Sequence, residues 1–257
     1  MYKSIVTEIV KRQKPKLLVI NASAFSQGNW NLTDEVYLRK WIDNMPMSQN
    51  KLDTVKTIPK NINKDDEKVK DNISDTLYFP LEKYHGNWKD PEAVYTSFVT
   101  RAYMRLSGGG YLKGFYSKTG ITGGRDNLAN IGQPTKEAYV LTDECRAYLK
   151  ELLSYCNKLG IEHVLLLQPP HETQAADKSG LEQIESITKE YGYDFLDLST
   201  DYESIAGIDD SHDFADFEHL NAYGAKKLTA YIGDMAVNQY CIKSDTCLLY
   251  TSDAADD

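Results

Sequence analysis

The stretch Ile161-Glu-His-Val-Leu-Leu-Leu-Gln-Pro-Pro170 decides the fold class of this chain. Its short apolar run, closed by two prolines, predicts a strand that is buried on both faces. A helix predicted over residues 178–191 follows, and Tyr193-Asp-Phe-Leu-Asp-Leu198 is the next predicted strand. Strands separated by a helix with short connections favour parallel pairing and a right-handed crossover. This half of the chain therefore predicts an α/β fold.

The same pattern extends toward both ends of the chain. Apolar residues at helical spacing predict a helix over residues 142–159 and another over 222–237, with Asn221 as a helix-capping residue. Near the N-terminus, a helix predicted over residues 2–12 leads into Leu17-Leu-Val-Ile20, a second strand expected to be buried on both faces. These elements predict a parallel sheet covered by helices.

Residues 22–141 do not continue this alternation of strands and helices. They contain helix candidates at residues 34–44 and 91–106 and a polar stretch at residues 60–75 that is rich in Lys and Asp. We interpret residues 22–141 as a large insertion, mostly helical or irregular, between two strands of the sheet.

Composition limits the classes of function. The chain has 257 residues and a net charge of −9, which argues against a nucleic-acid surface because phosphate binding needs clustered Lys and Arg. The cysteines lack the paired spacing of a disulfide framework or a zinc site, and Cys145 and Cys156 lie on the apolar stripe of a predicted helix. We expect both to be buried, and we expect no cofactor.

The last eleven residues, 247–257, need separate treatment. They match the translation of a transposase adapter that is used in DNA sequencing libraries. We therefore expect the natural reading frame to end by Thr246, and we assign residues 1–246 to a single domain.

The sequence Asp216-Phe-Glu-His219-Leu-Asn221 places a carboxylate and an imidazole in one predicted loop after a strand. A carboxylate at this spacing can hold the imidazole by its Nδ1–H and leave Nε2 to take a proton from a serine hydroxyl. The alternative is a surface loop with a helix-capping Asp, since Asp-x-x-His occurs often by chance. The spacing predicts two members of a Ser-His-Asp relay, Asp216 and His219.

The longer stretch from Asp216 to Lys226 resembles the C-terminal motif of SGNH (GDSL-type) hydrolases, above all bacterial cell-surface members that modify teichoic acids or exopolysaccharides. The resemblance implies a three-layer, flavodoxin-like α/β fold in which Asp216 and His219 are catalytic. Lys14-Pro-Lys-Leu-Leu-Val-Ile-Asn-Ala-Ser23 is similar to the family's central strand, whose following loop helps to form the oxyanion hole. This likeness places Asn21 and Ser23 at the cleft.

The chain departs from the family at the nucleophile. SGNH proteins place the serine in a tight turn after their first strand, upstream of the strand that matches Leu17-Leu-Val-Ile20. We therefore expect a fragment that is truncated at its N-terminus, lacks the nucleophile and a membrane anchor, and is inactive alone. Ser23 follows a strand but lacks the Gly-x-Ser turn that exposes a nucleophile.

Other residues are candidates for contact with a substrate. The aromatic stretch from Tyr78 to Trp88 is similar to a segment of the same cell-surface group, and in it Tyr84, His85 and Trp88 could stack on sugar rings. His171 follows a predicted strand and could line the cleft. The resemblance implies a carbohydrate or glycopolymer substrate, a membrane-bound acyltransferase partner, and a location in the cell envelope.

The expected function is therefore that of an acyl esterase or O-acyltransferase fragment that acts on a cell-envelope glycan. Two alternatives stay open at this point. One is a non-catalytic glycan-binding or assembly protein of the envelope. The other is a metal-dependent hydrolase that uses a cluster of imidazoles and carboxylates, because these groups together suit zinc; the candidate ligands are His212, Asp213, Asp216 and His219.

Overall fold

The structure of the chain is a computed structural model. It describes residues 2–26, 42–43, 45–61, 77–78, 91–92, 95–96, 99, 102, 120, 139–170, 178–216 and 219–243. The chain divides into two compact units: unit 1 combines Met1–Lys14 with Asn29–Gly110, and unit 2 combines Pro15–Gly28 with Tyr111–Asp257. No helix within the described ranges has both the length and the apolar character that crossing a membrane requires.

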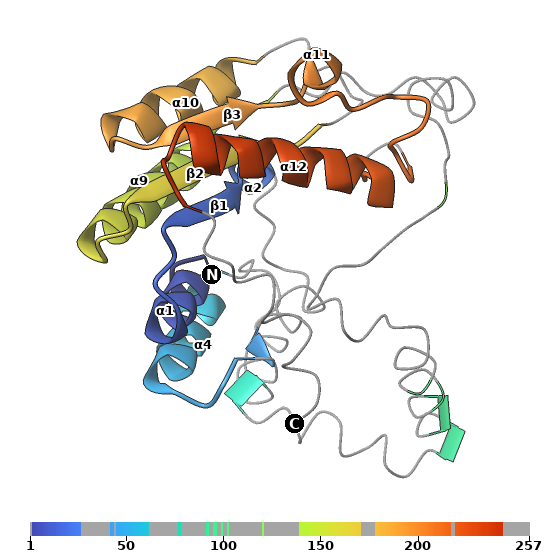
Figure 1. Cartoon of the computed structure of the whole chain (residues 1–257). Helices are drawn as coiled ribbons and strands as arrows, with labels where there is room; N and C mark the ends of the chain where they lie inside the picture. The colour runs from blue at the N-terminus through green and yellow to red at the C-terminus, as the bar shows by residue number, and fades with distance from the viewer. Residues whose placement is uncertain are drawn as a thin grey trace. The chain divides into compact units, whose positions relative to one another are not determined.

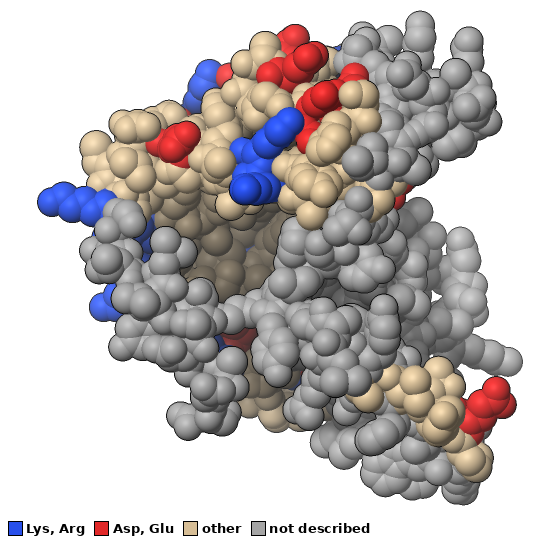
Figure 2. Space-filling view, turned by 45° about the vertical axis from the view of Figure 1, so that its right-hand side comes forward, with Lys and Arg blue, Asp and Glu red and all other residues tan. Residues whose placement is uncertain are grey.

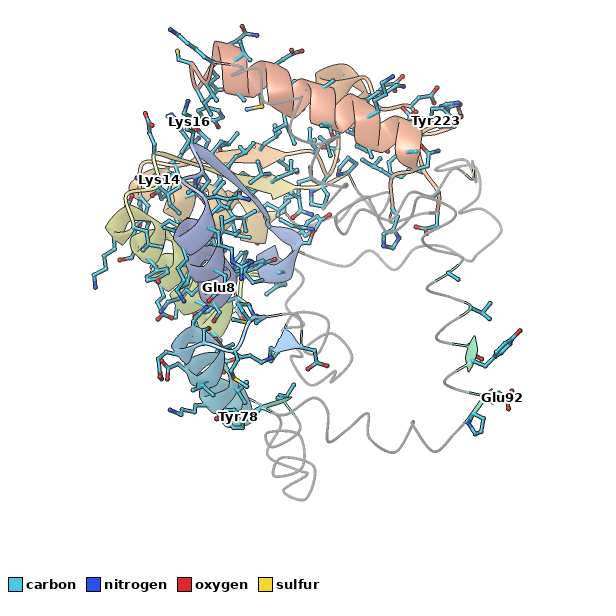
Figure 3. All side chains as sticks on the ribbon, turned by 60° about the horizontal axis from the view of Figure 1, so that its bottom comes forward. Glu8, Lys14, Lys16, Tyr78, Glu92 and Tyr223 are labelled. Atoms are coloured by element: carbon cyan, nitrogen blue, oxygen red, sulfur yellow. The ribbon has the colours of Figure 1, made fainter. Side chains whose placement is uncertain are left out.

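Unit 1 contains two described helices that pack together, α1 (Tyr2–Arg12) and α4 (Gln49–Asn61). The seam between them is polar. Asn50 Nδ2 donates to Glu8 Oε1 over 2.8 Å, and Thr54 Oγ1 donates to Ser4 Oγ over 2.6 Å. Figure 3 shows Glu8 on the side of α1 that faces α4. The helix predicted over residues 2–12 is confirmed, and unit 1 takes most of its residues from the predicted insertion.

Among the residues that the structure describes, the core of unit 2 is a parallel sheet of three strands in the order β1-β2-β3. The strands are β1 (Leu17–Asn21), β2 (His163–Gln168) and β3 (Asp194–Asp197). Both strand pairs are parallel, with Ile20 opposite Leu166 and Leu167 opposite Leu196. All residues of β2 after His163 are buried, as the apolar run predicted. The α/β class and the parallel pairing are therefore confirmed.

The described part of unit 2 also contains three long helices: α9 (Asp143–Lys158), α10 (Ser179–Glu190) and α12 (Ala222–Asn238). Figures 1 and 3 show α12 on one face of the sheet and α9 on the opposite face. Two short helices follow strands directly, α2 (Ser23–Ser26) after β1 and α11 (Tyr202–Ala206) after β3. The three long helices agree with the sequence prediction to within one or two residues at each end.

Capping residues explain where two of these helices begin. The Thr142 side chain accepts a hydrogen bond from the Cys145 N–H, and the Asn221 side chain accepts from the N–H groups of Tyr223 and Gly224. The expected role of Asn221 as an N-cap is confirmed. Cys145 and Cys156 are both buried in α9, also as expected. The helix candidates at residues 34–44 and 91–106 lie largely outside the described residues.

Candidate active site

Asp216 and His219, three residues apart in the loop before α12, are in direct contact. One carboxylate oxygen, Asp216 Oδ1, lies 2.7 Å from His219 Nδ1 and also accepts the His219 backbone N–H over 2.9 Å. The Asp216 side chain is 33% exposed and the His219 side chain is 63% exposed. The structure therefore brings the predicted pair together and leaves much of the imidazole open to solvent.

Backbone hydrogen bonds close the loop that carries this pair, residues 213–221. The Asn221 N–H donates to the Asp213 carbonyl over 2.9 Å, and the Ala215 N–H donates to the His219 carbonyl over 2.8 Å. Between these two bonds, Phe214 and Leu220 form an antiparallel bridge. The two sides of the loop thus run antiparallel, and the carboxylate and the imidazole come together at its closed end.

The 213–221 loop is anchored at the carboxyl end of the sheet. Phe214 and Leu220, which flank the pair, belong to one apolar cluster with Leu167 near the end of β2 and Leu198 just after β3. The other members of this cluster include Ile208 and, from α11 and α12, Tyr202, Leu228 and Ile232. The carboxyl ends of parallel strands are where α/β proteins place their ligands. The pair therefore lies at the edge of the sheet where a binding cleft is expected.

This geometry determines which form of the His219 ring makes use of the contact. A carboxylate only accepts hydrogen bonds, so the contact with Nδ1 is a hydrogen bond when the ring proton lies on Nδ1, which leaves the lone pair on Nε2. The arrangement suits a general base in which Nε2 of His219 accepts the proton.

A second imidazole lies beside a carboxylate at the start of the loop. His212 Nδ1 is 3.0 Å from Asp213 Oδ1, and the Asp213 side chain is fully buried whereas that of His212 is half exposed. Asp213 Oδ2 accepts from Lys227 Nζ over 2.5 Å and from the Asp209 N–H over 2.7 Å. Burial raises the pKa of the Asp213 carboxyl, but these hydrogen bonds and the Lys227 charge outweigh burial, and the pKa is lowered.

The structure does not form the metal cluster considered from the sequence. Among the described residues, no group of three or more His, Cys, Asp or Glu side chains is arranged to hold a metal ion. His212 and His219 bind separate carboxylates, and the carboxylate beside His212 is occupied by Lys227. The predicted cluster of His212, Asp213, Asp216 and His219 therefore divides into two independent pairs.

Asn21 and Ser23 also lie at the carboxyl end of the sheet. Asn21 is the last residue of β1 and is paired in register with Leu167, and the Ala22 N–H donates to the Leu167 carbonyl over 2.8 Å. Asn21 Oδ1 accepts the Ser23 N–H over 2.8 Å, so the Asn21 side chain orders the turn into α2. The two residues share an edge of the sheet with the anchor of the 213–221 loop.

The structure adds polar residues at this edge that the sequence analysis did not select. Asp197 ends β3, and its Oδ1 accepts the Ser199 N–H over 2.8 Å while Lys178 Nζ lies 3.8 Å from its Oδ2. Lys178 also donates to Thr200 Oγ1 over 2.9 Å. The sequence did indicate polar residues at this edge, because each of the three strands ends in one. The contact of Asp197 with Lys178 could not be predicted from the sequence, since it depends on how the chain folds.

Four predicted contact residues lie outside the described residues: Tyr84, His85, Trp88 and His171. On the face seen in Figure 2, both Lys or Arg and Asp or Glu side chains are visible among the described residues. In comparisons with known proteins, no protein-family model matches the chain, and no curated protein and no solved structure matches it significantly.

Proposed function

We propose that this chain is part of an SGNH-like acyl esterase or O-acyltransferase that acts on a cell-envelope glycan, with His219 as the general base and Asp216 as the residue that orients it. The observation that carries the proposal is the 2.7 Å contact between Asp216 Oδ1 and His219 Nδ1 in a loop anchored at the carboxyl end of a parallel sheet. The parallel strands with helices on both faces give the α/β class to which the three-layer architecture implied by the motif belongs.

In the proposed mechanism, His219 Nε2 takes the proton of a serine hydroxyl as the serine oxygen attacks the acyl carbonyl. Asp216 stabilises the imidazolium, and the negative charge on the carbonyl oxygen is held by N–H donors, with Asn21 as a candidate side-chain donor. The imidazolium then returns its proton to the departing alcohol or thiol as the acyl–serine ester forms. Water or a glycan hydroxyl next attacks this ester, and His219 accepts and returns one more proton.

We propose that the nucleophilic serine comes from outside this sequence. Ser23 is the first serine after β1, but it begins α2 and donates its N–H to Asn21 Oδ1 over 2.8 Å. A helical start of this kind differs from the strained strand-to-helix turn that exposes a nucleophile. The proposal also places the intact protein in the cell envelope, with a glycopolymer as substrate and a membrane-bound acyltransferase as partner.

The test uses a longer reading frame that contains this sequence and measures turnover of an acetyl ester. We expect His219→Ala and Asp216→Asn each to lower kcat by about 100-fold or more, because each removes part of the base. His163→Gln is the matched control, since His163 starts β2 at the opposite end of the strand from the site. Its activity should equal that of the unmodified protein.

The chain of 257 residues should show only background turnover of p-nitrophenyl acetate. Turnover that Ser23→Ala abolishes would show that Ser23 is the nucleophile and would overturn the proposal of an external serine. Unchanged acylation of cellular glycans in the His219→Ala protein would instead favour a non-catalytic envelope protein.

A further inference from the structure

The carboxylate of Asp213 is fully buried and accepts three hydrogen bonds. The donors are the backbone N–H of Asp209, the ring of the neighbouring His212, and the ammonium group of Lys227 in the second turn of α12. A buried carboxylate with several charge-assisted partners resists displacement, because moving it would leave both the anion and its donors without hydrogen-bond partners. The position of Asp213 is therefore strongly constrained.

The main chain of Asp213 is held against α12 as well. Its carbonyl accepts the Asn221 N–H over 2.9 Å, and a Cβ atom added to Gly224 would lie only 2.3 Å from the same carbonyl oxygen. The Asn221 side chain adds a third tie, because its Nδ2 donates to the His212 carbonyl over 2.6 Å. Asp213 thus joins the start of the 213–221 loop to the helix into which that loop leads.

We propose that Asp213, together with Lys227, is a positioning residue for His219: it fixes the two ends of the 213–221 loop so that Asp216 holds the imidazole by Nδ1. This inference rests on the proposed function of the pair. In this proposal, Asp213 does not contact the substrate, and His212 takes no part in proton transfer.

The fixed position of Asp213 determines where Asp216 and His219 lie, because the two sides of the loop pair in a fixed register. Asp213 pairs with Asn221, Phe214 with Leu220, and Ala215 with His219, so the next residue, Asp216, meets the imidazole at the closed end. The contact between Asp216 and His219 lies within a partly exposed loop, where solvent competes for both groups. A fixed register is what keeps their distance short, and a displacement of about 1 Å at a catalytic group can cost about 100-fold in rate.

The test reads the His219 ring directly. Nuclear magnetic resonance of the 15N-labelled chain shows which ring nitrogen carries the proton, because the two nitrogens are detected separately through the non-exchanging ring protons. In the unmodified chain, we expect neutral His219 to carry its proton on Nδ1. In Asp213→Asn, we expect the Nδ1–H signature to be lost, as it should also be in Asp216→Asn, which removes the acceptor itself.

Two further variants keep the test decisive if Asp213→Asn does not fold. Lys227→Gln removes the cation from a half-exposed side chain, and Lys227→Arg restores it. We expect Lys227→Gln to weaken the Nδ1–H signature of His219 and Lys227→Arg to retain it. Asp234→Asn is the matched control, because Asp234 is an exposed acid of α12 away from the loop.

The outcomes separate the inference from the proposed function. If the unmodified chain shows Nδ1–H at His219 and the Asp213 and Lys227 variants keep it while losing stability, Asp213 is only structural and the inference is overturned. If the unmodified chain carries the His219 proton on Nε2, the pair itself is not formed, and both proposals fail. Loss of the signature in folded Asp213 or Lys227 variants, with the control unchanged, supports the positioning role.

Discussion

Two pairs of imidazole and carboxylate lie in one short segment, yet their surroundings give them different chemistry. The Asp213 carboxylate is fully buried and also accepts a hydrogen bond from Lys227 over 2.5 Å. Asp216 is partly exposed, and its carboxylate contacts both the backbone N–H and the ring of His219. At the residue scale, this contrast supports the proposal that His219 is the base and that Asp213 is a structural acid.

The lowered pKa of Asp213 predicts a specific loss of stability in acid. The unfolded carboxyl titrates near its ordinary value of 3.8, and the folded carboxyl titrates below it, so the charged form stabilises the fold at higher pH. This contribution is fully present above about pH 5 and falls as the pH drops through the folded pKa. We expect the difference in unfolding free energy between the unmodified chain and Asp213→Asn to shrink accordingly.

Urea denaturation at a series of pH values measures that difference. Asp234→Asn, which removes an exposed acid of α12, should give a curve parallel to that of the unmodified chain. A gap between the unmodified chain and Asp213→Asn that does not change with pH would contradict the assigned role of the charge.

Local sequence patterns accounted for part of this site and long-range contacts for the rest. Asp216 and His219 could be paired from the sequence because a spacing of three residues in one loop already restricts their distance. The ion pair between Asp213 and Lys227 joins a loop to the second turn of a helix. No periodicity marks such a contact, and it follows only from the way α12 packs against the loop.

At the scale of elements, the predictability of a helix depended on what its buried face is made of. The helices α9 and α10 present apolar stripes and were predicted nearly to the residue. The buried face of α4 mixes the apolar Val55 with the polar residues Lys51 and Thr54, and Pro59 lies within the helix, so its sequence indicates a helix less clearly. The five-residue helix α11 is too short for any periodic signal.

Two glycines of α12 offer a matched test of how the helix packs. A Cβ atom at Gly224 would lie 2.3 Å from the Asp213 carbonyl oxygen, whereas one at Gly233 would meet nothing within 4 Å. We expect Gly224→Ala to destabilise the fold by about 1–3 kcal/mol, because a backbone atom must move. Gly233→Ala should stabilise it by up to about 1 kcal/mol, since alanine is the better helix former. Thermal or urea unfolding measures both, and equal effects would show that α12 does not press against the loop.

At the scale of the molecule, unit 2 buries its central strand β2 and the inner faces of α9 and α10. The strand β1 is only partly buried, with Val19 40% exposed, so the expectation that it is buried on both faces was wrong. Cys156 is fully buried in α9, and burial raises the pKa of its thiol to about 11. Cys241, which follows α12, is exposed. A thiol reacts as its thiolate and only when a reagent can reach it, so these two cysteines should report on the integrity of the core.

Alkylation with iodoacetamide followed by peptide mass spectrometry makes this measurable. In native buffer near neutral pH, we expect Cys241 to be modified rapidly and Cys156 to be modified only as fast as unit 2 opens. In concentrated urea, the two should react at similar rates, which serves as the control. Equal rates in native buffer would contradict the packing of α9 against the sheet.

The hydrogen bonds that hold the 213–221 loop come mainly from one continuous segment, residues 209–227, and one reaches outside it, because Asn221 Nδ2 also donates to the Gly120 carbonyl over 3.4 Å. The loop is seated on the sheet by the apolar contacts of Phe214 and Leu220. Under the proposed function, the base and the acid that orients it are therefore encoded in a different stretch of sequence from the serine on which they act.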